Sequence, residues 1–112
     1  MTSFRPWDIV VVPFPFTEGD TEKRRPALVV STSRLAADHD LYWLLMITSA
    51  ENRRWKNDVS VSHHQKAGLP VPSVIRTAKI ATLQEDRILR RLGSLDAADR
   101  AAVQKAIGVF LT

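Results

Sequence analysis

The apolar residues of this chain are gathered into short runs rich in β-branched side chains, and this grouping limits the fold more than any other feature. Proline, glycine or charged residues separate most of the runs, as they separate the strands of a sheet. Runs of this kind predict strands at Asp8–Phe16, Pro26–Ser31, Leu41–Thr48, Asp58–Ser62, Ser73–Arg76, Lys79–Leu83 and Ile88–Leu92.

Convincing helical spacing appears only near the end of the chain. Asp96 can cap the first turn of a helix there. The residues predicted to share its apolar face are Val103, Ile107, Phe110 and Leu111. Residues 33–40 fit either a short helical turn or a loop. Several short strands before one amphipathic helix indicate a mainly β (α+β) fold, with a small antiparallel sheet or barrel covered by the helix.

The composition favours a single domain. The 112 residues, 45% of them hydrophobic, suit one globular domain spanning 1–112. The absence of cysteine excludes disulfides, thiolate zinc sites and cysteine nucleophiles. No apolar run approaches the roughly 20 residues needed to cross a bilayer, and the first residues lack the layout of a signal peptide. We therefore expect a cytoplasmic protein with no membrane partner.

The basic residues favour a polyanionic partner. Sixteen Lys and Arg against twelve Asp and Glu give a net charge of +4. The most informative group is Lys23-Arg24-Arg25-Pro26, because the guanidinium of Arg25 matches phosphate geometry and Pro26 restricts the residue before it. A solvated basic hairpin is the more usual explanation of such a run.

Two other polar positions have alternative interpretations. Thr48, with Ser49 beside it, ends an apolar run, and its hydroxyl could serve a phosphate oxygen or simply a backbone group. Arg76 could pair with Asp58 or Glu51, or it could belong to a phosphate-binding surface.

An aromatic residue stands within a second basic cluster. Trp55, flanked by Arg53, Arg54 and Lys56, resembles a platform on which a base could stack, although a tryptophan covering one end of a barrel fits equally well. The histidines are His39, His63 and His64, which we expect to be exposed in loops. Because neighbouring side chains on an extended segment point apart, they predict no metal site.

Seven segments of the chain, taken together, resemble the PemK/MazF-type growth-inhibitor toxins of type II toxin–antitoxin systems. The segments are Asp8–Phe16, Lys23–Val30, Met46–Ser49, Ala67–Pro70, Ser73–Arg76, Lys79–Leu83 and Leu92–Leu95. The resemblance implies a homodimeric SH3-like or CcdB-like antiparallel β-barrel with a C-terminal α-helix. It also implies a cognate antitoxin and a metal-independent, cofactor-free, sequence-specific endoribonuclease that cleaves single-stranded RNA.

The same resemblance implies roles for individual residues. It makes Arg25 and Thr48 catalytic, with the 2′-OH of the RNA attacking the adjacent phosphate. Ala78 stands where some members carry an Asp two residues after Arg76, so a mechanism based on Arg25 and Thr48 is preferred. The loop of residues 17–24 is the candidate for selecting the RNA sequence. The residues predicted to bind substrate are Arg24, Ser49, Arg53, Arg54, Trp55 and Arg76.

Two other functions fit the same barrel. One is a non-catalytic, CcdB-like poison that binds a protein such as gyrase through its C-terminal helix. The other is a nucleic-acid-binding or protein-binding module of the SH3 type. Fold alone does not separate these functions from a nuclease. Incubation with a long RNA does, because only the nuclease produces discrete fragments.

Overall fold

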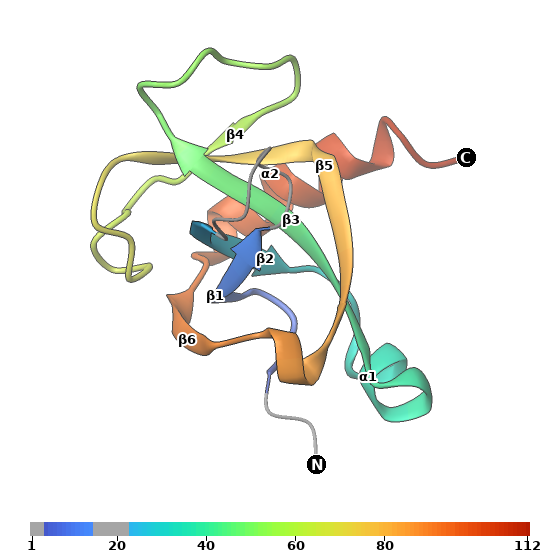
Figure 1. Ribbon diagram of the computed structural model, residues 1–112. Helices are drawn as coiled ribbons and strands as arrows, with labels where there is room; N and C mark the ends of the chain where they lie inside the picture. Colours follow the sequence, from blue (N-terminus) through green and yellow to red (C-terminus); the bar gives the residue numbers. More distant parts are fainter. Residues whose placement is uncertain (1–3, 15–22) are drawn as a thin grey trace.

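A computed structural model describes residues 4–14 and 23–112 of the protein. Its elements are β1 (Asp8–Phe14), β2 (Lys23–Val29), α1 (Ser33–His39), β3 (Leu41–Ser49), β4 (Val59–Ser60), β5 (Ser73–Gln84), the 3₁₀ helix η1 (Glu85–Arg87), β6 (Arg90–Ser94) and α2 (Ala97–Gly108). The strands form one antiparallel six-stranded sheet in the order β4-β5-β3-β2-β1-β6, curled into a half-barrel (Figure 1). The predicted fold class is confirmed, with β4 and β6 as open edges of the sheet.

Two strand predictions differ from the structure for an identifiable reason. The separate strands expected at 73–76 and 79–83 are one strand, β5, whose pairing with β3 shifts between Leu45 and Met46. Met46 pairs with Arg76 and Leu45 with Ile80, so the intervening residues form a bulge that interrupts the apolar pattern without ending the strand.

Other strand boundaries also move. β2 starts at Lys23 instead of Pro26, because β1 and β2 pair as far as Phe14 and Lys23. The strand expected at 58–62 is only Val59–Ser60, and β6 lies two residues later than expected. Residues 15 and 16 of the first predicted strand lie outside the described residues.

The C-terminal helix begins where the sequence predicts but ends earlier. α2 packs against β4 and β5, whereas α1 lies beside β3 (Figure 1). Val103 is buried and Ile107 packs against the core, but Phe110 and Leu111 follow the helix and are 51% and 67% exposed. The predicted apolar face is therefore wrong beyond Ile107, since the helix stops at Gly108, a poor helix former. None of the helices described in the structure combines the length and hydrophobicity that crossing a bilayer requires.

The start of α2 is tied to the long loop between β4 and β5. The buried carboxylate of Asp99 accepts hydrogen bonds from the backbone N–H and the hydroxyl of Ser62, at 2.9 and 2.6 Å. Asp96 makes no side-chain capping bond, and its Oδ2 instead lies 2.7 Å from Nδ1 of His63. These contacts fix one end of the loop against the helix.

Alternate residues of the strands face two apolar clusters, as the period of two in a strand requires. The cluster that includes Ala36 of α1, here called the α1-side cluster, is built on Phe4, Val10, Val12, Ala27, Val29, Tyr42, Leu44, Met46 and Ile88. The α2-side cluster is built on Ile9, Leu28, Leu45, Ile47, Ala67, Leu69, Ile75, Leu95 and Val103. The central strands are thus covered on both faces, and their polar residues lie at the strand ends.

Tyr42 makes the stability of this core dependent on pH. Burial, together with the hydrogen bond that its hydroxyl donates to Oε1 of Glu85 at 2.7 Å, raises the pKa of Tyr42 from 10.0 to about 12. The resulting stabilisation is complete below pH 10 and is lost as the pH rises through about 12. We expect the free energy of unfolding to fall by up to about 1.4 kcal/mol per pH unit in this range. Denaturant titrations should show this fall in the native protein and not in Tyr42→Phe; equal slopes would contradict it.

Candidate active site

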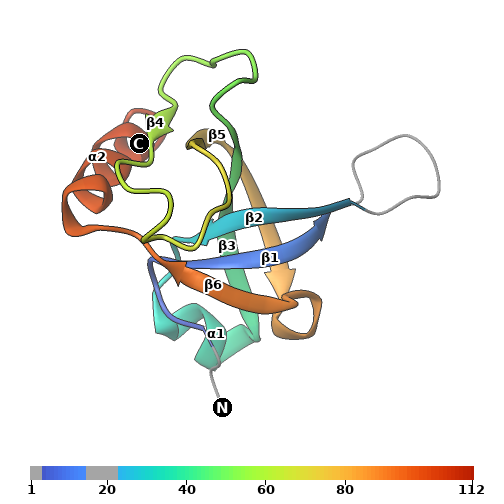
Figure 2. The same cartoon turned by 90° about the vertical axis from the view of Figure 1, so that its left-hand side faces the viewer.

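A cavity of about 700 Å³ is lined by residues from the start of β2 and the end of β3, together with residues of β1 and β6. β6, β1 and β2 lie side by side in the sheet (Figure 2). Its volume lies within the usual range for ligand-binding sites, about 300–1,000 Å³. The residues that line it are Val11, Lys23, Arg24, Arg25, Pro26, Ile47, Thr48, Ser49, Asn52, Gly68, Pro70, Val71, Ser73, Arg90 and Leu92. Strand ends form one side of the cavity, and the loop between β4 and β5 forms the other.

The register of the sheet brings Arg25 and Thr48 to the same place. β2 and β3 pair through Leu28 with Leu45 and Ala27 with Met46. Arg25 and Thr48 lie two residues beyond the last of these pairs, near the start of β2 and the end of β3. Both side chains are partly exposed and both line the cavity. A single ligand bound in the cavity could therefore contact both residues predicted as catalytic.

The charge lining the cavity is positive. Lys23, Arg24, Arg25 and Arg90 line it, and no Asp or Glu occurs among the described lining residues. Within residues 4–14 and 23–112, the side chains of the three arginines make no hydrogen bond or ion pair, so their guanidinium groups are available to a ligand. Uncompensated cations gathered in a concave site favour an anion, and arginine suits phosphate in particular.

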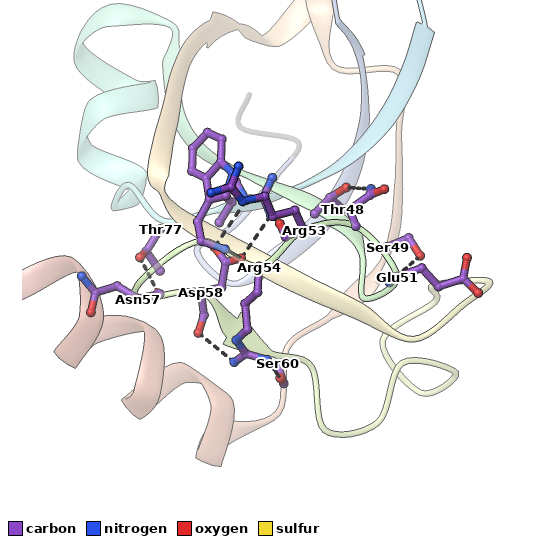
Figure 3. Close-up of polar contacts among 12 residues, drawn as sticks. Thr48, Ser49, Glu51, Arg53, Arg54, Asn57, Asp58, Ser60 and Thr77 are labelled. Carbon is purple, nitrogen blue, oxygen red and sulfur yellow. Dashed lines mark hydrogen bonds and ion pairs between the residues drawn. The ribbon is translucent and has the colours of Figure 1, made fainter.

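Thr48 has a polar neighbour that the sequence did not suggest. Nδ2 of Asn52 donates a hydrogen bond of 2.6 Å to Oγ1 of Thr48, drawn in Figure 3. Ser49, the adjacent predicted residue, accepts a bond of 3.2 Å at its Oγ from the backbone N–H of Glu51. The end of β3 therefore presents two hydroxyl groups with defined partners, and both residues line the cavity.

Arg76 lies outside the lining of the cavity, and its Nε and Nη2 groups bond to protein acceptors. Its Nη2 lies 3.1 Å from Oδ2 of the buried Asp58 and donates to the carbonyl of Arg53 at 2.7 Å (Figure 3). Its guanidinium carbon lies 4.2 Å from the centre of the Trp55 ring. Of the alternatives considered for Arg76, pairing with Asp58 is the one observed, and this cluster orders the loop between β3 and β4.

The family model for the PemK-like, MazF-like toxin of type II toxin–antitoxin systems matches residues 5–111. The chain belongs to this family. Solved structures of MazF-type proteins share the fold of this toxin. They include a MazE–MazF complex from Deinococcus radiodurans, with 22% identity over 98% of this chain and 97% of that chain and a TM-score of 0.78.

Two mycobacterial structures have the same fold as this toxin. An endoribonuclease in complex with its cognate antitoxin, from a mycobacterial species, has 15% identity over 99% of this toxin and 95% of that chain, with a TM-score of 0.76. The Mycobacterium tuberculosis toxin MazF-mt6 has 22% identity over 91% and 93% of the two chains, with a TM-score of 0.74. At these identities the likeness establishes the fold alone. Comparison with curated proteins gives no match.

The remaining candidate residues of this MazF-like toxin lie outside the cavity. Arg53, Arg54 and Trp55 occupy the loop between β3 and β4, where Arg54 donates bonds of 3.3 Å to Oγ of Ser60 and to the carbonyl of Asp58. Trp55 is 41% exposed, with Arg76 over one ring face. Of the loop at 17–24, residues 17–22 lie outside the described residues.

The histidines of the toxin were expected to be exposed in loops, and two of the three differ from this expectation. His39 ends α1, His63 contacts Asp96, and His64 is half-buried. In the described parts of the chain, no three His, Asp or Glu side chains gather as a metal site would require.

Proposed function

We propose that this MazF-like toxin is a sequence-specific, metal-independent endoribonuclease that cleaves single-stranded RNA, with Arg25 and Thr48 acting at the scissile phosphate. One observation carries the proposal. The guanidinium and the hydroxyl come from neighbouring strand ends and line one cavity whose described charged residues are all cationic. A phosphodiester is the anion that such a pair suits, because arginine neutralises its charge and threonine donates to it.

The reaction needs no nucleophile from the protein. The 2′-oxygen of the ribose bonds to the adjacent phosphorus as its proton passes to solvent water, and the bond from phosphorus to the 5′-oxygen breaks. The leaving 5′-oxygen takes a proton from solvent water, which gives a 2′,3′-cyclic phosphate and a 5′-OH end. Arg25 stabilises the negative charge that grows on the non-bridging oxygens, and Thr48 donates to the same phosphate. Binding the strand in this geometry supplies the rest of the acceleration.

Other residues extend the binding surface. Arg24 and Ser49 line the cavity with Arg25 and would contact the phosphates beside the scissile one. Arg90 of β6 adds a cation that the sequence did not single out. Arg53, Arg54 and Trp55 are exposed on the neighbouring loop, where they would contact RNA that continues beyond the cavity, and one face of Trp55 would stack a base. Arg76 would act by holding this loop, through its bonds to Asp58 and Arg53.

The proposal includes a protein partner and an assembly. A MazE–MazF complex and an endoribonuclease bound to its cognate antitoxin share this fold, which supports a cognate antitoxin for this toxin as well. An antitoxin segment carrying acidic residues would compete with RNA for the cationic cavity. The resemblance to MazF-type toxins likewise supports a homodimer.

Cleavage should proceed without a metal. Purified toxin should cut a long single-stranded RNA into discrete fragments with 2′,3′-cyclic phosphate and 5′-OH ends, at the same rate with and without EDTA. Mapping the fragment ends on one defined transcript tests both the chemistry and the sequence preference. Loss of cleavage in EDTA that added divalent metal restores would contradict the mechanism, and intact RNA with tight binding to gyrase would favour the non-catalytic poison.

A further inference from the structure

We propose that Asn52 is a positioning residue, which orients the hydroxyl of Thr48 so that its proton points to the scissile phosphate. The inference rests on the proposed nuclease function and adds a residue to it. Asn52 lines the cavity with Thr48, and no family resemblance of the sequence drew attention to it.

The argument starts from the hydrogen-bonding capacity of the two groups. A threonine hydroxyl has one proton to donate and two lone pairs, whereas the Nδ2 group of asparagine only donates. The bond of 2.6 Å from Nδ2 of Asn52 therefore occupies a lone pair on Oγ1 of Thr48. The hydroxyl proton is left free and turns away from Asn52. A hydroxyl held in this way is prepared to donate before substrate arrives, which is the condition for efficient electrostatic stabilisation.

The backbone around Asn52 is held on both sides. Its own N–H donates to the carbonyl of Ser49 at 3.1 Å, which closes the turn that follows β3. The N–H of Glu51 donates to Oγ of Ser49 at 3.2 Å within the same turn. The carbonyl of the next residue, Arg53, accepts a bond of 2.7 Å from Arg76. Asn52 is thus fixed beside Thr48 by contacts that do not involve its side chain.

This arrangement separates a positioning role from a structural one. The bond between Asn52 and Thr48 is exposed, and an exposed hydrogen bond contributes little to folding. Removing the amide should leave the turn and the fold intact, because the backbone bonds remain. An effect on cleavage would then report the orientation of the hydroxyl.

The test is a double-mutant cycle of Asn52→Ala and Thr48→Val, measured as the single-turnover cleavage rate of a short RNA that contains one mapped cut site. Asn52→Ala should slow the native toxin by about 10- to 100-fold, the cost of a misoriented group. In the Thr48→Val background, where no hydroxyl remains, the same change should have no further effect. Binding of an RNA whose scissile position carries 2′-deoxyribose should change less than about twofold, since the phosphate-binding arginines remain.

Two further variants sharpen the cycle. Asn52→Asp keeps the shape of the side chain but accepts a bond from Thr48, so it should cleave more slowly than Asn52→Ala. Gln104→Ala removes an exposed amide from α2 and should cleave at the native rate. The inference is overturned if Asn52→Ala cleaves like the native toxin, or slows both backgrounds by the same factor. Absence of cleavage by the native toxin itself would instead overturn the proposed function, and this inference with it.

Discussion

Replacement of Arg25 by alanine should reduce RNA cleavage by about 10³-fold or more, because one charge-assisted donor to a developing oxyanion is already worth about 10²–10³. Arg25 contributes both charge and a planar pair of donors to the cavity that Thr48 also lines. The fold should survive, since the side chain of Arg25 makes no hydrogen bond or ion pair with another described residue. Single-turnover cleavage and thermal unfolding, measured on the same preparation, test both statements.

Two variants show whether the effect belongs to the guanidinium. Arg25→Lys keeps the charge but loses the planar fork, so it should recover only part of the activity. Arg34→Ala removes the same charge from α1, where Arg34 pairs with Asp38 in an exposed i,i+4 contact. This control should cleave normally. Native cleavage by a folded Arg25→Ala variant would refute the assignment of Arg25.

Gly93→Ala should strongly destabilise the protein. A Cβ atom at Gly93 would lie 2.3 Å from the carbonyl oxygen and 2.6 Å from the carbonyl carbon of Ala67, so backbone must move. The reciprocal contact is equally close, because a Cβ at Gly68 would lie 2.2 Å from the oxygen of Leu92. We expect a loss of about 3 kcal/mol of stability. For a domain of this size the loss lowers Tm by roughly 10–15 °C.

The same substitution should also impair the cavity. Gly68 and Leu92 both line it, so separating the loop from β6 widens the space in which RNA would be held. Gly108→Ala is the matched control, because a Cβ there meets no atom within 4 Å and alanine favours the helix. Gly108→Ala should keep or slightly raise Tm. A Gly93→Ala protein with native Tm and native cleavage would show that the two segments separate easily.

Local patterns of apolar residues predicted which strands and helices exist better than they predicted where each begins and ends. The run at 41–48 became β3 almost without change, because its apolar residues are buried on both faces of the sheet. The break at Thr77 and Ala78 was interpreted as the end of a strand, although it is a bulge in β5. Only pairing with β3 distinguishes these cases, and pairing is not local information.

The candidate site was predictable where it depends on strand ends and obscure where it depends on tertiary contacts. Arg25 and Thr48 stand at positions that the family resemblance marked, and both line one cavity at the ends of two paired strands. Arg90 and Arg91 look alike in the sequence. Successive side chains of β6 point to opposite faces, and β6 pairs with β1. Nε of Arg91 therefore donates to Oδ1 of Asp8 at 3.0 Å, whereas Arg90 lines the cavity. Asn52 escaped notice because its partner is set by a turn, for which the sequence offered no apolar pattern.

Hydrogen bonds from Ser62 and His63 to the start of α2 allow the C-terminal helix to affect the cavity, although the helix lies outside it. The helix supplies no side chain to the cavity, yet the loop that it restrains supplies Gly68, Pro70 and Val71. A shift of the helix would therefore be expected to move the loop that lines the cavity. A protein seated on the helix would therefore alter RNA turnover without competing for the arginines, and resistance mutations would arise far from the chemistry that they affect.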